Sequence, residues 1–379
     1  MNFNYSEDQN IFVNSLEKLL NDRFGPEARS TLLEQDLDYD RALWQSCAEM
    51  GFLGLTFPEE YGGFNGSSID AMVASIEFGK NLAYLPFISS IILGAGALRI
   101  AGDDKQKQDL LPGIADGKLT LAVAFTEPDS RFDLSDIATS GNSDGDGYRL
   151  NGRKAVVFGG AEADLLIVSA RTSGEDLCSF DGISLFIVDG DTQGVEKTPY
   201  RMLNGQKAAD ISFNNVKVSR DQLLGAPDCA YTVIEHVVDL GTAAICAETL
   251  GALEKINELT LEYLKQRHQF GRSIGSFQVL QHHMVDMLIE YEHARSLVYE
   301  ACMKADSDNA AERGRAVSAA KAFIAEKGRI ICQKAMQMHG GIGITQEYEL
   351  SEYVKRVTMA EFAFGDVDHH LIRFADLDD

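Results

Sequence analysis

The sequence predicts an α+β fold in which an N-terminal helical domain, a middle β domain and a C-terminal four-helix bundle follow one another. Three patterns predict it. Apolar residues recur at helical spacing over residues 1–117, short β-branched and aromatic runs fill residues 118–225, and helical spacing returns over residues 226–379. No proline follows Pro227, which is typical of long uninterrupted helices. We therefore expect three domains with these bounds.

The first domain is expected to begin with a helix. Ser6 followed by Glu7–Gln9 is a helix-start signal, because a serine hydroxyl caps free backbone N–H groups and acidic residues suit the first turn. Apolar residues then recur at helical spacing, at Phe12, Leu16, Leu19 and Leu20. The segment 57–63 interrupts this pattern, because its proline and paired glycines mark a loop.

The middle domain reads as a small barrel or sandwich of short strands. The expected strands lie at residues 119–125, 148–150, 155–158, 165–170, 183–188 and 211–218. Residues 140–147 are rich in Ser, Gly, Asn and Asp, so we expect a turn there.

The last domain is expected to be a bundle of long antiparallel helices. One stripe of large side chains at helical spacing contains Phe277, Leu280, Met284, Met287 and Tyr291. A second helix is indicated by Ala319, Phe323, Lys327 and Ile330. Between them, residues 306–314 are polar and are expected to form a turn.

Composition excludes several classes of function. Lys and Arg total 34 against 58 Asp and Glu, and a formal net charge of -24 repels nucleic acid and anionic membranes. The six cysteines form no C-x-x-C pair and lack a histidine at metal-ligand spacing, so we expect neither disulfides nor a metal site. The N-terminus lacks the features of a secretory signal, and no apolar run reaches membrane-spanning length. We expect a cytoplasmic protein.

Two motifs in the last domain have the chemistry that an anionic cofactor requires. In Gln337–Gly343, the adjacent Gly340 and Gly341 let backbone N–H groups come close to an anion. In Arg267–Gly271, the arginine offers a planar guanidinium that grips phosphate oxygens bidentately. Taken singly, an arginine at a helix end is more often a solvated cation or a carbonyl cap, and a glycine pair is more often a plain turn. The co-occurrence of both motifs behind a β domain favours the functional interpretation.

These motifs resemble the Gln-x-x-Gly-Gly-x-Gly element and the Arg-x-x-Phe-Gly loop of flavin-dependent acyl-CoA dehydrogenases, and the resemblance covers nearly the whole chain. It implies FAD as cofactor and an acyl-CoA thioester as substrate. It also implies that one group of residues approaches the FAD of a neighbouring subunit, namely Arg267, Gln269, Phe270, Gln337, Gly340 and Gly341. Gln278, in the helix that follows the arginine loop, is implied as a further cofactor-binding residue. Thr126 begins a Thr-Glu-Pro sequence that in this family lies against the flavin.

Other residues by which family members hold their own flavin are replaced in this chain. The Gly-x-Gly-Ser-Asp sequence that follows Thr-Glu-Pro is absent, and Phe132 stands where the resemblance places the serine. The Trp-x-Thr sequence that packs on the flavin ring reads Val156, Val157 and Phe158. The resemblance therefore implies that the polar groups facing the flavin are missing.

No catalytic base is expected in this chain. Counting from the motifs places Phe364 and Gly241 at the two positions where family members carry the base, and Thr242 replaces an arginine that contacts the thioester ligand. Removing an α-proton requires a carboxylate within hydrogen-bond reach, so neither Phe364 nor Gly241 can do it. Glu361 lies one helical turn away and is the remaining substitute, although an ion-paired or solvated acid is the simpler interpretation. The histidines His339, His369 and His370 are expected to be structural.

We therefore expect a subunit without the catalytic glutamate in a heteromeric α2β2 acyl-CoA dehydrogenase. Such complexes act on steroid side-chain or pimeloyl thioesters, with a Glu-bearing partner subunit and an electron-transfer flavoprotein as electron acceptor. Two alternatives remain: a homotetrameric flavoprotein with desulfinase or oxidase chemistry, and a non-catalytic scaffold or binding subunit.

Overall fold

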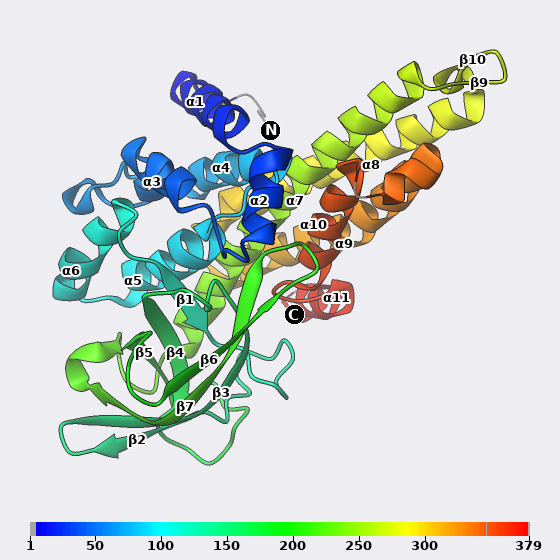
Figure 1. Cartoon of the computed structure of the whole chain (residues 1–379). Coiled ribbons are helices and arrows are strands. Elements are labelled where there is room, and N and C mark those ends of the chain that lie inside the picture. Colours follow the sequence, from blue (N-terminus) through cyan, green and yellow to red (C-terminus); the bar gives the residue numbers. More distant parts are fainter. Residues whose placement is uncertain (1–4, 346, 378–379) are drawn as a thin grey trace. The chain divides into compact units, whose positions relative to one another are not determined.

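The computed structural model describes residues 5–345 and 347–377, which belong to two compact units. The described part of the first unit contains residues 5–31, 68–83 and 242–377 apart from residue 346, and the second contains residues 32–67 and 84–241. Along the chain, helices come first, strands follow, and helices return (Figure 1). The predicted α+β fold class is confirmed.

The helices that precede the sheet are α1 (Glu7–Arg23), α2 (Pro26–Glu34), α3 (Arg41–Glu49), α4 (Ser68–Lys80), α5 (Ala95–Ala101) and α6 (Asp104–Ala115). Ser6 caps α1 as expected, because its hydroxyl accepts the backbone N–H of Gln9, and the Gln9 side chain accepts the N–H of Ser6. The predicted loop at residues 57–63 contains one 3-10 turn, Glu59–Tyr61.

The eight strands of the second unit join in one sheet. They are β1 (Leu121–Ala124), β2 (Ser140–Asp144), β3 (Gly147–Phe158), β4 (Leu165–Arg171), β5 (Ile183–Asp189), β6 (Val195–Arg201), β7 (Lys207–Ser219) and β8 (Leu223–Leu224). The order is β6-β7-β3-β2-β4-β5-β8, and β1 pairs parallel with β4. The hydrophobic core of this sheet is made of buried aliphatic side chains together with Phe186 and Phe213.

Strands β2, β6 and β8 of this sheet were not expected from the sequence. The predicted turn at residues 140–147 is shorter than expected, because residues 140–144 form β2 and pair antiparallel with β3, which leaves Gly145 and Asp146 as the turn. Polar residues suit β2 because Asn142, Ser143 and Asp144 are exposed. Strand β6 gave no apolar signal and contains Pro199, which an end strand tolerates because one of its edges needs no N–H donor.

The helices that follow the sheet are α7 (Tyr231–Gln266), α8 (Gln278–Ala305), α9 (Ala310–His339), α10 (Leu350–Phe362) and α11 (Val367–Asp376). A short hairpin, β9 (His268–Gln269) and β10 (Arg272–Ser273), joins α7 to α8. The expected polar turn at residues 306–314 ends early, because Asn309 caps α9 and Arg313 is buried in its first turns. None of the helices within the described part of the chain is long and apolar enough to span a membrane.

Glycines let α4 and α7 approach each other closely within the first unit. A Cβ added at Gly79 would lie 1.9 Å from the carbonyl oxygen of Glu248, and one added at Gly251 would lie 2.0 Å from that of Ile76. Nearby, buried Arg356 of α10 donates to Glu248 Oε1 at 2.5 Å and to the carbonyl oxygen of Ala83 at 3.2 Å. The glycines thus let α4 and α7 touch, and the hydrogen bonds of Arg356 hold α10 beside them.

Candidate functional site

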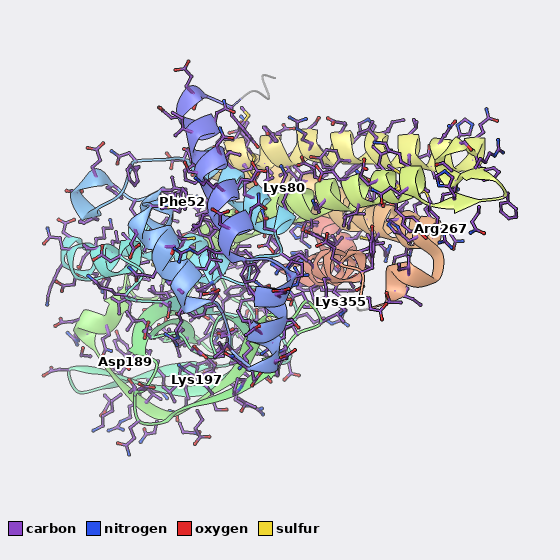
Figure 2. The ribbon with its side chains drawn as sticks, turned by 45° about the horizontal axis from the view of Figure 1, so that its top comes forward. Phe52, Lys80, Asp189, Lys197, Arg267 and Lys355 are labelled. Atoms are coloured by element: carbon purple, nitrogen blue, oxygen red, sulfur yellow. The ribbon has the colours of Figure 1, made fainter. Side chains whose placement is uncertain are left out.

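Arg267 follows directly on α7, beside the β9–β10 hairpin (Figure 2). The hairpin turns through Phe270 and Gly271, which have φ of 55° and 78°. The Phe270 ring is 90% exposed. The Arg267 side chain is exposed and makes no hydrogen bond or ion pair with the residues that the structure describes. The connection between α7 and α8 therefore carries an exposed cation without a polar partner among the described residues, and an exposed aromatic ring three residues further on.

The glycine turn lies at the end of α9. Gly340 has φ of 63°, and an added Cβ at Gly340 or Gly341 would meet no atom within 4 Å. Gln337 is also exposed, as are Gln269 and Gln278. The exposed backbone of this turn is accessible to a ligand from outside the chain.

An aromatic stack joins the ends of α7 and α9. The Tyr263 and His339 rings lie 4.5 Å apart with an angle of 23°, and Tyr348 lies against both. His339 Nδ1 is 2.8 Å from the carbonyl oxygen of Ala335, so Nδ1 carries the hydrogen and Nε2 accepts from the Tyr348 hydroxyl. Burial lowers the pKa of His339, which keeps the ring neutral. The stack brings the Arg267 hairpin and the glycine turn to the same end of the helices.

These two segments fit the phosphate part of a dinucleotide. A phosphate prefers a guanidinium and backbone N–H groups. The Arg267 side chain has no polar partner among the described residues. The N–H of Gly340, however, donates to the carbonyl oxygens of Met336 and Gln337, so the glycine pair offers close approach to its backbone rather than a free donor at Gly340. The residues come from adjacent helix ends and are open to solvent. Their openness suits a cofactor that is held mainly by another subunit.

The positions of the second unit that were predicted to face the flavin carry apolar side chains, apart from Thr126. Thr126 is half-buried, and so are Phe132 and Phe158. Val156 is exposed with φ of 52°, a conformation that a β-branched residue rarely adopts, and its N–H donates to Asp210 Oδ1 at 3.0 Å. Among these positions, Thr126 alone offers a side-chain hydroxyl.

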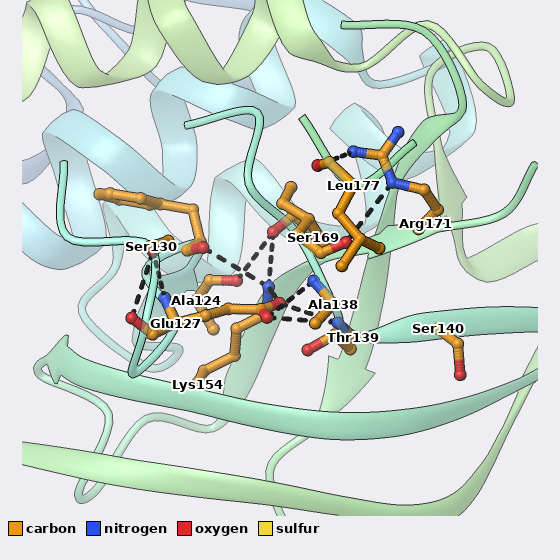
Figure 3. Close-up of polar contacts among 12 residues, drawn as sticks. Ala124, Glu127, Ser130, Ala138, Thr139, Ser140, Lys154, Ser169, Arg171 and Leu177 are labelled. Atoms are coloured by element: carbon orange, nitrogen blue, oxygen red, sulfur yellow. Dashed lines mark hydrogen bonds and ion pairs between the residues drawn. The ribbon is translucent and has the colours of Figure 1, made fainter. Parts of the chain in front are cut away.

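A buried ion pair stabilises the segment around Thr126 (Figure 3). Lys154 Nζ donates to Glu127 Oε1 at 2.6 Å and to Ser169 Oγ at 2.9 Å. The Glu127 carboxylate also accepts the backbone N–H groups of Ala138 and Thr139. Burial opposes charge on Glu127, but Lys154 outweighs it and holds the pKa of this carboxyl below its usual value. The pair links β3 and β4 to the loop that carries Thr126 and Phe132.

The candidate base positions hold no carboxylate. Phe364 follows α10 and is half-buried, and Gly241 and Thr242 are buried in α7. The substitute acid, Glu361, is 8% exposed, and its Oε1 accepts from Arg329 Nη1 at 3.0 Å. This carboxylate is therefore engaged in an ion pair, as the simpler interpretation of the sequence predicted.

Two further residues lie beside Phe364: Lys321, which the sequence did not single out, and His370, which was expected to be structural. Lys321 of α9 and His370 of α11 are buried and contact the backbone around Phe364. Lys321 stands in an alanine-rich helical stretch, where a lysine usually indicates a solvent-exposed face. Its contact with residue 365 joins distant parts of the chain, so no spacing pattern in the sequence predicts it. Within the described residues, no group of His, Cys, Asp and Glu has the arrangement of a metal site.

Comparison with known proteins identifies the family. Residues 6–118, 122–216 and 231–376 match the models of the acyl-CoA dehydrogenase N-terminal, middle and C-terminal domains. The Probable acyl-CoA dehydrogenase YngJ of Bacillus subtilis is 30% identical over 370 residues, which cover 96% of each chain. The chain belongs to the acyl-CoA dehydrogenase family. A 3-(aryl)acrylate reductase of Clostridium sporogenes is 32% identical over 333 residues, or 86% of each chain.

Solved structures of this family have the same fold. The ChsE4–ChsE5 complex from Mycobacterium tuberculosis matches with a TM-score of 0.89 and 26% identity over 99% of this chain and 98% of that one. The Tcur3481–Tcur3483 steroid ACAD variant matches with a TM-score of 0.88 and 28% identity over 98% of each. The FAD complex of PigA has a TM-score of 0.91 and 25% identity over 99% and 98%. The predicted cofactor of the family, FAD, is thus confirmed, and the chain is an oxidoreductase-family flavoprotein.

Proposed function

We propose that this chain is the subunit without the catalytic glutamate in a heteromeric, cytoplasmic FAD-dependent acyl-CoA dehydrogenase. The complex converts an acyl-CoA thioester to the 2,3-enoyl-CoA. One contrast carries the proposal: Arg267, Gly340 and Gly341 are open to an external anion, whereas Phe364 and Gly241 occupy the base positions. The chain keeps the residues expected to contact the cofactor of a neighbouring subunit, and it lacks the residues that would hold a flavin and a substrate of its own.

Each retained residue has a defined task in this proposal. The Arg267 guanidinium holds pyrophosphate oxygens, and the backbone at Gly340 and Gly341 approaches the same group. Phe270 adds an apolar surface beside them. FAD held there would supply the acceptor for the hydride from the β-carbon of the acyl group, and a glutamate of the partner subunit would take the α-proton.

Exposed apolar residues on α8 support assembly with another subunit. Val285, Leu288 and Ile289 follow the i, i+3, i+4 pattern of one helix face, and each is about half exposed. A helix of a partner chain is a natural cover for this face. The neighbour named as the ChsE4–ChsE5 complex supports an α2β2 assembly, and the one named as a steroid ACAD supports a role in lipid or steroid degradation.

An electron-transfer flavoprotein is the electron acceptor in this proposal. Caffeyl-CoA reductase-Etf complex subunit CarC of Acetobacterium woodii, 30% identical over 354 residues, supports this choice. A second candidate function is a homotetrameric flavoprotein of the same fold with other chemistry, because three relatives are named as reductases or as a reductase subunit. A scaffold subunit without any flavin is the third.

Purification of the chain alone and with a Glu-bearing relative tests the proposal. We expect the chain alone to bind little FAD, and the co-purified complex to contain FAD that an acyl-CoA reduces, as seen by bleaching of its visible absorbance. One FAD per subunit in the chain alone, reduced by acyl-CoA, contradicts the proposal. Stoichiometric FAD without thioester oxidation favours the second candidate, and a complex without FAD favours the scaffold.

A further inference from the structure

The turn that carries Phe364 has a disfavoured backbone. Phe364 and Gly365 have φ of 59° and 123°. A left-handed conformation is unfavourable for an aromatic residue, so neighbouring groups must hold it. At Gly365, an added Cβ would lie 2.5 Å from His369 Cδ2 and 2.6 Å from His370 Nε2, so a side chain there would displace these rings.

Lys321 binds the carbonyl groups on both sides of Phe364. Its Nζ donates to the carbonyl oxygen of Glu361 at 2.9 Å and to that of Gly365 at 2.6 Å. The side chain is fully buried. Burial lowers the pKa of Lys321 to about 8, against the opposing effects of Cys246 and Glu361. A buried ammonium whose hydrogen bonds go to two backbone carbonyls ties α9 to the end of α10.

His370 binds the carbonyl group of Phe364 itself. His370 Nε2 lies 3.1 Å from this oxygen, which only accepts, so Nε2 carries the hydrogen. Its Nδ1 then accepts from the Ser318 hydroxyl at 3.2 Å. Burial, together with the charge on Lys321, lowers the pKa of His370 to about 2, so the ring is neutral at ordinary pH.

Lys321 and His370 form a clamp that acts only on the backbone. Their hydrogen bonds go to the carbonyl oxygens of residues 361, 364 and 365, and none goes to the side chain of residue 364. The clamp therefore holds this turn whatever side chain residue 364 carries. By holding the backbone, it fixes the direction in which the side chain leaves the chain at the predicted base position, although the base itself is absent.

We propose that Lys321 and His370 are positioning residues that hold residue 364 in one orientation, so that the Phe364 ring is a fixed apolar surface. That this surface faces an acyl group rests on the proposed function. The clamp itself does not, because every group in it belongs to this chain.

Fluorine NMR of the full chain with 4-fluorophenylalanine at position 364 tests the clamp. We expect one narrow resonance in the wild type. Lys321→Met and His370→Leu remove the hydrogen-bond donors, and we expect the resonance to shift and broaden. His370→Gln keeps an N–H donor and should retain the narrow line. Lys327→Met removes a partly exposed lysine of the same helix, whose ammonium pairs with Glu326, and should change nothing.

Unchanged spectra in both Lys321→Met and His370→Leu overturn the proposal, and so does equal broadening in His370→Gln and His370→Leu. Thermal unfolding gives a second readout for unstable variants. Glycine adopts the left-handed conformation without help, so the fall in Tm caused by His370→Leu should be smaller in a Phe364→Gly background. An equal fall in both backgrounds also overturns it. A complex that lacks dehydrogenase activity contradicts the proposed function but leaves these results unaffected.

Discussion

Lys154 Nζ lies 2.6 Å from Glu127 Oε1, and the two side chains are among the most deeply buried charges of the second unit. Lys154 belongs to β3, and Glu127 to the loop that carries Thr126. The remaining lone pairs of the carboxylate accept N–H groups of Ala138 and Thr139. The pair therefore stabilises the loop as well as the sheet.

Removing one partner of this pair should be strongly destabilising. Lys154→Met leaves Glu127 buried without its cation, and we expect a loss of about 3–5 kcal/mol in the free energy of unfolding. Adding Glu127→Gln should recover part of the loss. Urea unfolding measures both. Lys118→Met is the matched control, because its pair with Asp116 is exposed and should contribute about 0–1 kcal/mol.

The same pair predicts a dependence on acid pH. The folded state lowers the pKa of Glu127 below 4.5, so its contribution to stability is present above that pH and is lost as pH falls through the folded pKa. Glu127→Gln should be less stable than wild type at pH 7, and the difference should shrink below about pH 4.5. Urea unfolding at several pH values measures it. A difference that stays constant down to pH 3 contradicts this prediction.

Arg267→Ala should weaken cofactor binding without destabilising the fold. Because the side chain is exposed and makes no polar contact within the described chain, its loss should leave Tm unchanged. In the complex, losing a hydrogen-bonded charge on a phosphate should weaken FAD binding about 10- to 100-fold. Lys265→Ala is the control, since Lys265 is an exposed cation in the last turn of α7 that pairs with Glu262. Similar FAD affinity in both variants would argue against a role for Arg267.

Local signals in the sequence were sufficient for part of the fold. Ser6 and the stripe through Met287 and Tyr291 depend on neighbours within one or two helical turns, so spacing alone predicts them. Strand β6 was missed because its pattern is polar and contains a proline. The contacts of Lys321 with residues 361 and 365 join segments about forty residues apart, and no pattern along the chain indicates them.

Phe364→Glu should not turn this chain alone into a dehydrogenase. The clamp holds the backbone, so the new carboxylate should lie at the base position. However, two positions of the second unit that are expected to face the flavin remain apolar, because Phe132 and Phe158 cannot replace the missing hydroxyl groups. We expect no reduction of FAD by acyl-CoA in the purified chain, with Phe364→Gln as control. Activity with Glu but not with Gln would show that this chain holds its own flavin.

Substituting glycines by alanine should distinguish packing from cofactor contact. Gly79→Ala and Gly251→Ala place a methyl group about 2 Å from backbone oxygen atoms, so the helices must move apart. We expect each to cost at least about 1–3 kcal/mol in the free energy of unfolding. Gly341→Ala places its methyl group in open space, and its φ is not left-handed, so the chain should unfold at the wild-type temperature.

In the complex, however, the Gly341 backbone is expected to lie close to the phosphates of the partner's FAD. A methyl group on residue 341 would keep these phosphates away from the backbone. We therefore expect Gly341→Ala to lower the FAD content of the complex, measured by its visible absorbance per subunit. Normal FAD content with an unchanged Tm would mean that the open space beside Gly341 is only solvent. A lowered Tm in the chain alone would mean that the glycine serves the fold, because no cofactor is then present to explain the loss.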